Sequence, residues 1–197
     1  MKRHIASAVT VLALSLATGF AQTDGQPAPT IQQRKYDQQQ RIANGIDNGS
    51  LTAGETKRLE RGEANLNREE GAMRAADNGK LTAADRATLN RQQNGLSARI
   101  YADKHNANNA HYGNNEVGQR RLAQQQRIAN GIRSGQMTPG EAARTENKEQ
   151  GLNREIAGMR QANGGKLTPG EHKLVNHQQN QVSKQIYRQK HNGKVGF

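Results

Sequence analysis

The sequence contains a long internal repeat, and this feature limits the folds that the chain can adopt. Residues 38–106 align with residues 124–192, 86 positions later and without a gap, with 37 identities in 69 positions. The most similar blocks read QQQRIANGI, LNRE, GKLT and IYxxKHN. A weaker repeat, offset by 30 positions, pairs DNGSLT at 47–52 with DNGKLT at 77–82. We therefore expect an array of similar supersecondary units.

Four G-x-[LM]-T segments predict the starts of helices. In each segment the threonine can cap a helix, and the acidic residue three positions later can accept a hydrogen bond from the cap amide. The preceding glycine suits the left-handed end of the previous helix, and in two segments a proline follows at the first helical position. The predicted cap pairs are Thr52 with Glu55, Thr82 with Asp85, Thr138 with Glu141, and Thr168 with Glu171.

Apolar residues between these caps follow a narrow helical stripe. Leu59, Leu66 and Met73 are spaced by seven, and the other predicted helices show steps of three, four and seven. We predict helices at residues 35–47, 53–76 and 83–105, with the same three repeated in the second copy. The predicted fold class is all-α, with elongated antiparallel helical hairpins in two tandem three-helix copies. Because each stripe is narrow, a single thick hydrophobic core is not expected.

The first 21 residues have the features of a secretory signal peptide. Lys2 and Arg3 precede a mainly apolar run at residues 5–16, and Ala21 ends a small-x-small cleavage site. The run is shorter than the roughly 20 residues of a membrane span. We expect secretion to the periplasm or the exterior, with no transmembrane span. The other predicted divisions are a mobile N-terminal segment at 22–34, copy 1 at 35–106, a linker at 107–119 with an exposed Tyr112, copy 2 at 120–192, and a tail at 193–197.

The composition excludes several classes of function. The absence of cysteine excludes disulfides, thiolate metal sites and cysteine nucleophiles. The net charge of +12 becomes +10 when Lys2 and Arg3 leave with the signal peptide, and such a charge attracts polyanions or simply maintains solubility. The chain has no Trp and only 2 Phe and 4 Tyr, and its Lys and Arg residues are interspersed with acids instead of clustered. Dedicated nucleic-acid recognition is therefore not expected.

No catalytic or metal-binding pattern is present in the sequence. The motifs G-x-x-x-x-G-K-[ST], G-x-S-x-G and H-E-x-x-H do not occur. His172 and His177 are five residues apart, which places them on different faces of a helix, and neither belongs to a dense acidic cluster. We expect a protein that is not an enzyme and that has no cofactor and no metal.

Polar residues that recur in both copies are the candidates for contact with a partner. A functional interpretation is an anion or polymer contact that is made twice. The alternative is structural, because Lys and His complement the negative end of a helix dipole and polar side chains can link helices. The candidates are Tyr101, Lys104, His105, Tyr187, Lys190, His191, Arg68 and Arg154.

The turns resemble EF-hand calcium loops. In residues 44–55, Gly49 stands at position six of a twelve-residue loop, Leu51 at position eight and Glu55 at position twelve. A complete EF-hand would coordinate Ca²⁺ with side chains at positions one, three, five and twelve. All four loops depart from this pattern, because position three is apolar: Ile46, Ala76, Ile132 and Ala162.

The same G-x-L-T-x-x-[EQ] turn resembles, more loosely, the LTxxQ signature of small helical periplasmic stress chaperones. Here Glu or Asp stands where that signature has Gln. The overall pattern is similar to secreted bacterial helical repeat proteins, a resemblance that implies no mechanism. Three hypotheses follow: a binding or scaffolding module for an anionic envelope component or for self-association, a chaperone-like stress protein, and a degenerate calcium-binding protein.

Overall fold

A computed structural model describes residues 28–196 of the chain. Residues 1–27, which include the predicted signal peptide, and residue 197 lie outside the described part. The described residues form six α-helices and no strand, as the predicted all-α fold class requires. The helices are α1 (Ile31–Asp47), α2 (Ala53–Ala76), α3 (Ala83–Lys104), α4 (Glu116–Arg133), α5 (Pro139–Ala162) and α6 (Pro169–Lys190).

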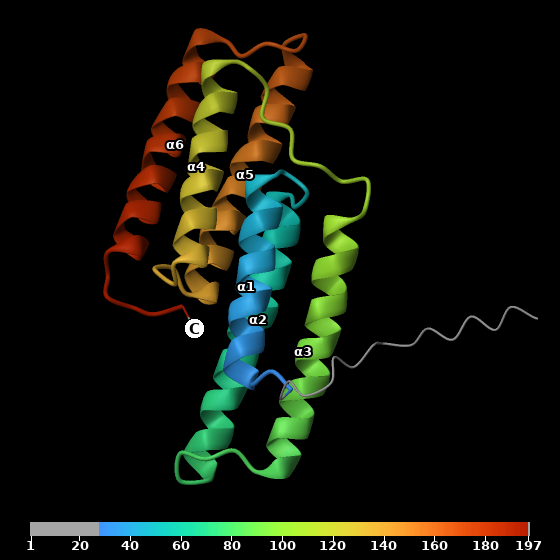
Figure 1. The fold of residues 1–197 in the computed structure, drawn as a ribbon. Coiled ribbons are helices and arrows are strands. Elements are labelled where there is room, and N and C mark those ends of the chain that lie inside the picture. Colours follow the sequence, from blue (N-terminus) through green and yellow to red (C-terminus); the bar gives the residue numbers. More distant parts are fainter. Residues whose placement is uncertain (1–27, 197) are drawn as a thin grey trace, which may run out of the picture.

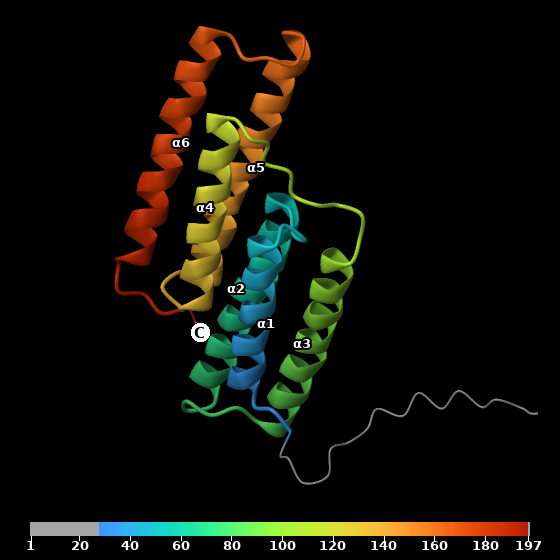
Figure 2. The same cartoon turned by 45° about the horizontal axis from the view of Figure 1, so that its top comes forward.

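The helices form two three-helix halves that pack side by side. In the N-terminal half α3 packs against α1 and α2, and in the C-terminal half α6 packs against α4 and α5. The largest contacts join the halves, since α2 packs along α5 and α1 packs along α4. Figure 1 shows α1 and α4 side by side, with α3 and α6 on opposite flanks. The rotated view in Figure 2 keeps this arrangement, so the four central helices form a bundle between two outer helices.

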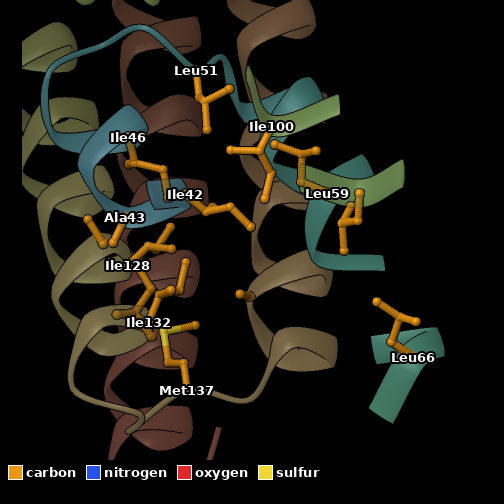
Figure 3. Close-up of a cluster of buried hydrophobic side chains, with 14 of the residues drawn as sticks. Ile42, Ala43, Ile46, Leu51, Leu59, Leu66, Ile100, Ile128, Ile132 and Met137 are labelled. Carbon is orange, nitrogen blue, oxygen red and sulfur yellow. The ribbon is translucent and has the colours of Figure 1, made fainter. Parts of the chain in front are cut away.

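The main apolar core crosses the boundary between the halves. Ile42, Ile46 and Leu59 from the N-terminal half pack in one cluster with Ile128 and Ile132 from the C-terminal half. Figure 3 shows these side chains converging between helices of both halves. A second, smaller cluster of buried apolar residues lies around Leu152 and Val175, so the apolar residues are divided between two cores. The narrow stripes share the main core because the halves place their apolar faces against each other.

All four predicted threonine caps stand at helix starts. Each accepts a hydrogen bond from the backbone amide three residues later, and the acidic side chain there accepts one from the backbone N–H of the threonine. The preceding glycines have positive φ values of 74°, 84°, 71° and 89° at Gly49, Gly79, Gly135 and Gly165. Only glycine adopts this conformation without a steric cost. In each repeated turn, therefore, the glycine ends one helix and the threonine caps the start of the next.

Two helices begin earlier than the sequence pattern predicted. The segment at 22–34, predicted to be mobile, ends in the first turn of α1, where Thr30 is the N-cap. Likewise α4 starts at Glu116 with Asn115 as its cap, inside the predicted linker at 107–119. Neither start carries the G-x-[LM]-T pattern, and for that reason the pattern placed both boundaries too late. None of the helices in the described range is long and apolar enough to span a bilayer.

Where polar residues interrupt the apolar stripes, buried glutamines form hydrogen bonds between the helices. Gln38 on α1 donates through Nε2 to the carbonyl of Gln93 on α3 at 2.8 Å, and Gln93 donates to the carbonyl of Ile31 at 3.0 Å. The same bonds recur 86 residues later, from Gln124 to Gln179 at 2.7 Å and from Gln179 to Val117 at 2.9 Å. Hydrogen bonds of this kind satisfy polar groups that burial would otherwise penalise.

Candidate basic groove and buried carboxyl cluster

The outer side of the α2–α5 contact carries a dense group of basic side chains, which we call the basic band. Its centre is an open groove of about 700 Å³ lined by Arg61 and Arg68 from α2 and by Arg144 and Lys148 from α5. None of the described residues that line this groove is acidic. The band as a whole contains Lys57, Arg58, Arg61, Arg68, Arg144, Lys148 and Arg154.

The cations of the band are close enough to affect one another. Partial burial, followed by the positive charges of Arg61, Arg154 and Arg58, lowers the pKa of Lys57. Within the described residues the only ion pair of the band joins Arg58 to Asp103, at 3.8 Å. Among the described residues, the other six cations of the band have no acidic partner. Together they produce a positive potential, which binding of an anion would lower.

The predicted polar contact residues do not come together as one site. Arg68 lines the central groove and Arg154 lines a second hollow at the end of the band. In contrast, Tyr101 stacks on His105 with ring centroids 4.1 Å apart at the end of α3, and Tyr187 stacks on His191 at 4.2 Å at the end of α6.

These stacked pairs occupy helix ends, as the structural alternative expected. His105 Nδ1 lies 2.7 Å from the carbonyl oxygen of Tyr101, and His191 repeats this contact with Tyr187. Lys104 and Lys190 are half-buried in the last turns of the same helices. α3 and α6 lie on opposite flanks (Figure 1), so the two motifs form separate surfaces.

The asparagine of the repeated KHN block has a role that the sequence did not reveal. Asn106 donates to Glu55 Oε1 at 2.9 Å, and Asn192 donates to Glu141 Oε1 at 2.7 Å. The other oxygen of each glutamate binds its capping threonine. Both oxygens of these position-twelve glutamates are thus engaged within the protein. A Ca²⁺ ion in either loop would have to displace those bonds.

Comparison of the chain with family models, with curated proteins and with solved structures finds no match in any of the three. Within residues 28–196, no group of three or more His, Cys, Asp or Glu side chains is arranged to hold a metal ion.

Sequence reasoning missed a group of buried acids between α2 and α5. Glu60, Glu63, Glu146 and Glu149, which we call the carboxyl cluster, are each at most 1% exposed. None of them is in an ion pair with a cation in the described structure. All four acids are identical between the copies, but their spacing of three residues fits a polar side of a helix as well as a buried one.

The surroundings of the cluster favour protonated carboxyl groups. Burial raises the pKa of Glu63 to about 8, although Lys35 and a hydrogen bond from Gln39 oppose this shift. Burial raises the pKa of Glu149 to about 7 against the charge of Arg121. The pKa values of Glu60 and Glu146 lie well above the ordinary range, because both are fully buried and because neighbouring carboxyl groups repel a second charge.

Tyr112 in the linker packs against the protein, which corrects the expectation of an exposed side chain. The Arg121 guanidinium lies 5.4 Å from the centre of the Tyr112 ring, within range of a cation–π interaction. Burial, followed by the charge of Glu146, raises the pKa of the Tyr112 hydroxyl to about 12. Gly118 is needed here, since a side chain at that position would collide with the Tyr112 carbonyl. The linker is thus fixed to the start of α4.

Proposed function

We propose that this protein is a non-catalytic, secreted binding module whose basic band holds a linear anionic polymer of the cell envelope or exterior. The single observation that carries this proposal is the groove between α2 and α5, which four cations and no acids line. The guanidinium groups of Arg61, Arg68 and Arg144 suit bidentate contact with phosphate, sulfate or carboxylate groups. Secretion is the part of the proposal that depends on the sequence of residues 1–21 alone.

The chemistry of the band favours a polymer without aromatic bases. The described residues that line the central groove include no Tyr or Phe, so they offer no platform on which a base could stack. The groove is also open to solvent and is lined by four cations, unlike the enclosed pockets that bind small molecules. A flexible polyanion that makes several equivalent contacts along the band fits these features best.

The surface gives less support to the chaperone hypothesis. Large contiguous apolar patches on a protein surface mark sites that bind other proteins. In the described residues the large exposed apolar side chains are scattered over α1, α3, α6 and the C-terminal segment: Tyr36, Tyr101, Leu174, Tyr187 and Val195.

The proposal can be tested by heparin binding with a charge-matched pair of variants. The band variant carries R61Q, R68Q, R144Q and K148Q. The control variant carries R91Q, R99Q, K184Q and R188Q, which remove the same number of exposed Arg and Lys residues from α3 and α6. Both variants have the same net charge, so a difference between them reports the position of the charges.

We expect the band variant to bind heparin about tenfold or more weakly than the control, because counterion release scales with the number of anion contacts. Its dependence of log K on log salt should also become shallower, by about one unit per lost contact. Equal loss of affinity in both variants would mean that only net charge matters. The basic band would then not be a binding site.

A further inference from the structure

The carboxyl cluster lies at the joint between the two halves of the molecule. α2 and α5 form the most extensive contact between any two helices. Glu60 is close enough to Glu146 for their charges to interact across this contact. Gln39 from α1 donates to Glu60 Oε2 at 3.4 Å, and Gln125 from α4 donates to Glu146 Oε2 at 3.1 Å. All four central helices therefore meet at these carboxyl groups.

The joint lacks the partners that four carboxylates would need. Within the described part of the chain, one oxygen of each carboxyl group in the cluster has no hydrogen-bond donor, and neither have the side-chain oxygens of Gln39 and Gln125. Among residues 28–196, the cations that act on the cluster are Lys35 of α1, near Glu63, and Arg121 of α4, near Glu149. Both are already engaged, Lys35 with Glu70 and Arg121 with the Tyr112 ring. Buried carboxylates without paired cations are strongly disfavoured.

Protons can reach the cluster through a small polar opening. Glu149 and Gln125 line a pocket of about 170 Å³ next to Tyr112, His111 and Arg121. This pocket lies where the linker crosses α4 and α5. A buried acid at its edge can therefore exchange its proton with solvent without unfolding of the bundle.

We propose that the carboxyl cluster is a proton-dependent joint, which holds α2 against α5 while its acids are neutral and opens when they ionise. Ionisation places like charges on Glu60 and Glu63 of one helix and on Glu146 and Glu149 of the other. Their repulsion and their need for water both favour separation of the two helices. The two halves remain connected by the linker.

The sign of the pH effect follows from the raised pKa values. In the unfolded chain these glutamates lose their protons near pH 4.5, whereas Glu149 and Glu63 keep theirs to about 7 and about 8 in the folded protein. Between these limits the folded state binds more protons, so stability falls as the pH rises. The closed joint is favoured at acidic pH and weakens through pH 7 to 8.

Opening of the joint would also divide the basic groove, because Arg61 and Arg68 come from α2 while Arg144 and Lys148 come from α5. This consequence rests on the proposed function. By linkage, a polyanion that bridges α2 and α5 would favour the closed joint and would be bound with uptake of protons.

The joint can be tested by the distance between the halves. Cysteines are introduced at Ala98 on α3 and Lys184 on α6, which are exposed and equivalent in the repeat, and a donor and an acceptor dye are attached. The chain has no native cysteine to interfere. Energy transfer is then measured from pH 6 to 9. The test variant carries E63Q and E149Q, which mimic neutral carboxyls, and the control carries E69Q and E155Q on the same helices.

We expect energy transfer in the parent protein and in the E69Q/E155Q control to fall between pH 6 and 9, and transfer in E63Q/E149Q to remain at its pH 6 value. Histidines are common to all three proteins and cannot produce this difference. Unchanged transfer in the parent protein, or an equal fall in the test variant, would overturn the joint. If E63Q/E149Q does not fold, ¹³C-glutamate titration of the parent decides: midpoints above pH 6 support the joint, and midpoints all below pH 5 refute it.

Heparin affinity measured over the same pH range separates the two proposals. A fall in both energy transfer and affinity supports both. If energy transfer falls while affinity stays constant, the joint stands and the groove is not the binding site. If affinity changes while energy transfer is constant, the joint is wrong.

Discussion

The two halves place three helices in the same order but stabilise them with different chemistry. In the N-terminal half Lys35 Nζ lies 2.5 Å from Glu70 Oε2, and both side chains are buried. In the C-terminal half the equivalent positions hold Arg121, which lies over the Tyr112 ring, and Ile156, which is buried in an apolar cluster. One half therefore contains a buried ion pair where the other contains a cation–π contact and an apolar side chain.

A second difference lies beside the carboxyl cluster. Leu59 is fully buried in the main apolar core. Its equivalent, Thr145, accepts a hydrogen bond from Gln185 at 3.1 Å and donates one to Gln189 Oε1 at 2.6 Å. The apolar residues of the C-terminal half are divided between the main core and a second cluster around Leu152 and Val175. At this position the N-terminal half depends on packing and the C-terminal half on hydrogen bonds, the reverse of the difference at Lys35 and Glu70.

The largest expected effect is loss of the buried ion pair through K35L. This substitution leaves Glu70, whose side chain is 5% exposed, without its closest cation. Burial disfavours the Glu70 charge, but hydrogen bonds from Lys35 and Arg74 outweigh it and lower the pKa of Glu70. We expect K35L to reduce the free energy of unfolding by about 3 kcal/mol, measured by urea denaturation.

The double variant K35L/E70I tests whether the two charges are required at these positions or whether apolar side chains that fill the same space are sufficient. It gives the N-terminal half the isoleucine of the C-terminal half and leaves no unpaired charge. We expect it to recover most of the stability lost in K35L, because well-packed apolar residues can replace a buried ion pair. A double variant as unstable as K35L would show that the ion pair itself is needed.

The next effect is expected from the packing difference between Leu59 and Thr145. L59A should cost about 3 kcal/mol, because it removes a fully buried side chain and leaves a cavity. T145A should cost about 1 to 2 kcal/mol, because Gln189 loses its hydrogen-bond donor. Midpoints of urea denaturation at equal m-values measure both. Equal costs would contradict the contrast between packing and hydrogen bonding.

The helices and their caps could be predicted from the sequence because those signals are local. A threonine, the acid three residues later and the preceding glycine fix a helix boundary without reference to the rest of the chain. The starts of α1 and α4 were placed too late because Thr30 and Asn115 cap their helices without that pattern.

The joint between the halves could not be predicted, because it depends on long-range contacts. The spacing of Glu60 and Glu63 fits the buried side of α2 as well as a polar side. Only the packing of α5 over them decides that both are buried. The basic band has the same origin, since Arg61 and Arg144 are 83 residues apart in the sequence and line one groove.

A smaller effect is expected at the linker, which contacts α4 through Tyr112. Y112A removes a half-buried ring and its contact with Arg121. We expect a loss of about 1 to 2 kcal/mol in unfolding free energy. Amide hydrogen exchange should speed up at the start of α4 and not in α3. Uniform acceleration over the whole chain would mean that Tyr112 does more than fix the linker.

The caps should contribute less, and unequally. Thr52 and Glu55 form a capping box that Asn106 and Asn108 also join, at 2.9 and 3.3 Å from Glu55 Oε1. The box of Thr82 and Asp85 lies at the surface. We expect T52A to cost about 1 kcal/mol and T82A about 0.5 kcal/mol, compared by their denaturation midpoints. A larger cost for T82A would indicate that the asparagine contacts do not strengthen the first box.

The smallest expected effect separates the capping acids from the buried acids by the sign of their pH dependence. Burial opposes ionisation of Glu55 and Glu141, but hydrogen bonds from Thr52 and Thr138 outweigh it and lower both pKa values. Their carboxylates therefore stabilise the fold above pH 4.5, and this contribution is lost as the pH falls through the folded pKa. E55Q/E141Q should cost about 0.3 to 1 kcal/mol per site at pH 6 and less at pH 3, because the helix dipole then meets a neutral group in both proteins.

Melting temperatures of the variant and the parent should thus converge toward low pH, whereas those of E63Q/E149Q and the parent should diverge toward high pH. Convergence of both pairs at the same end of the pH range would show that the two sets of acids are not in opposite environments.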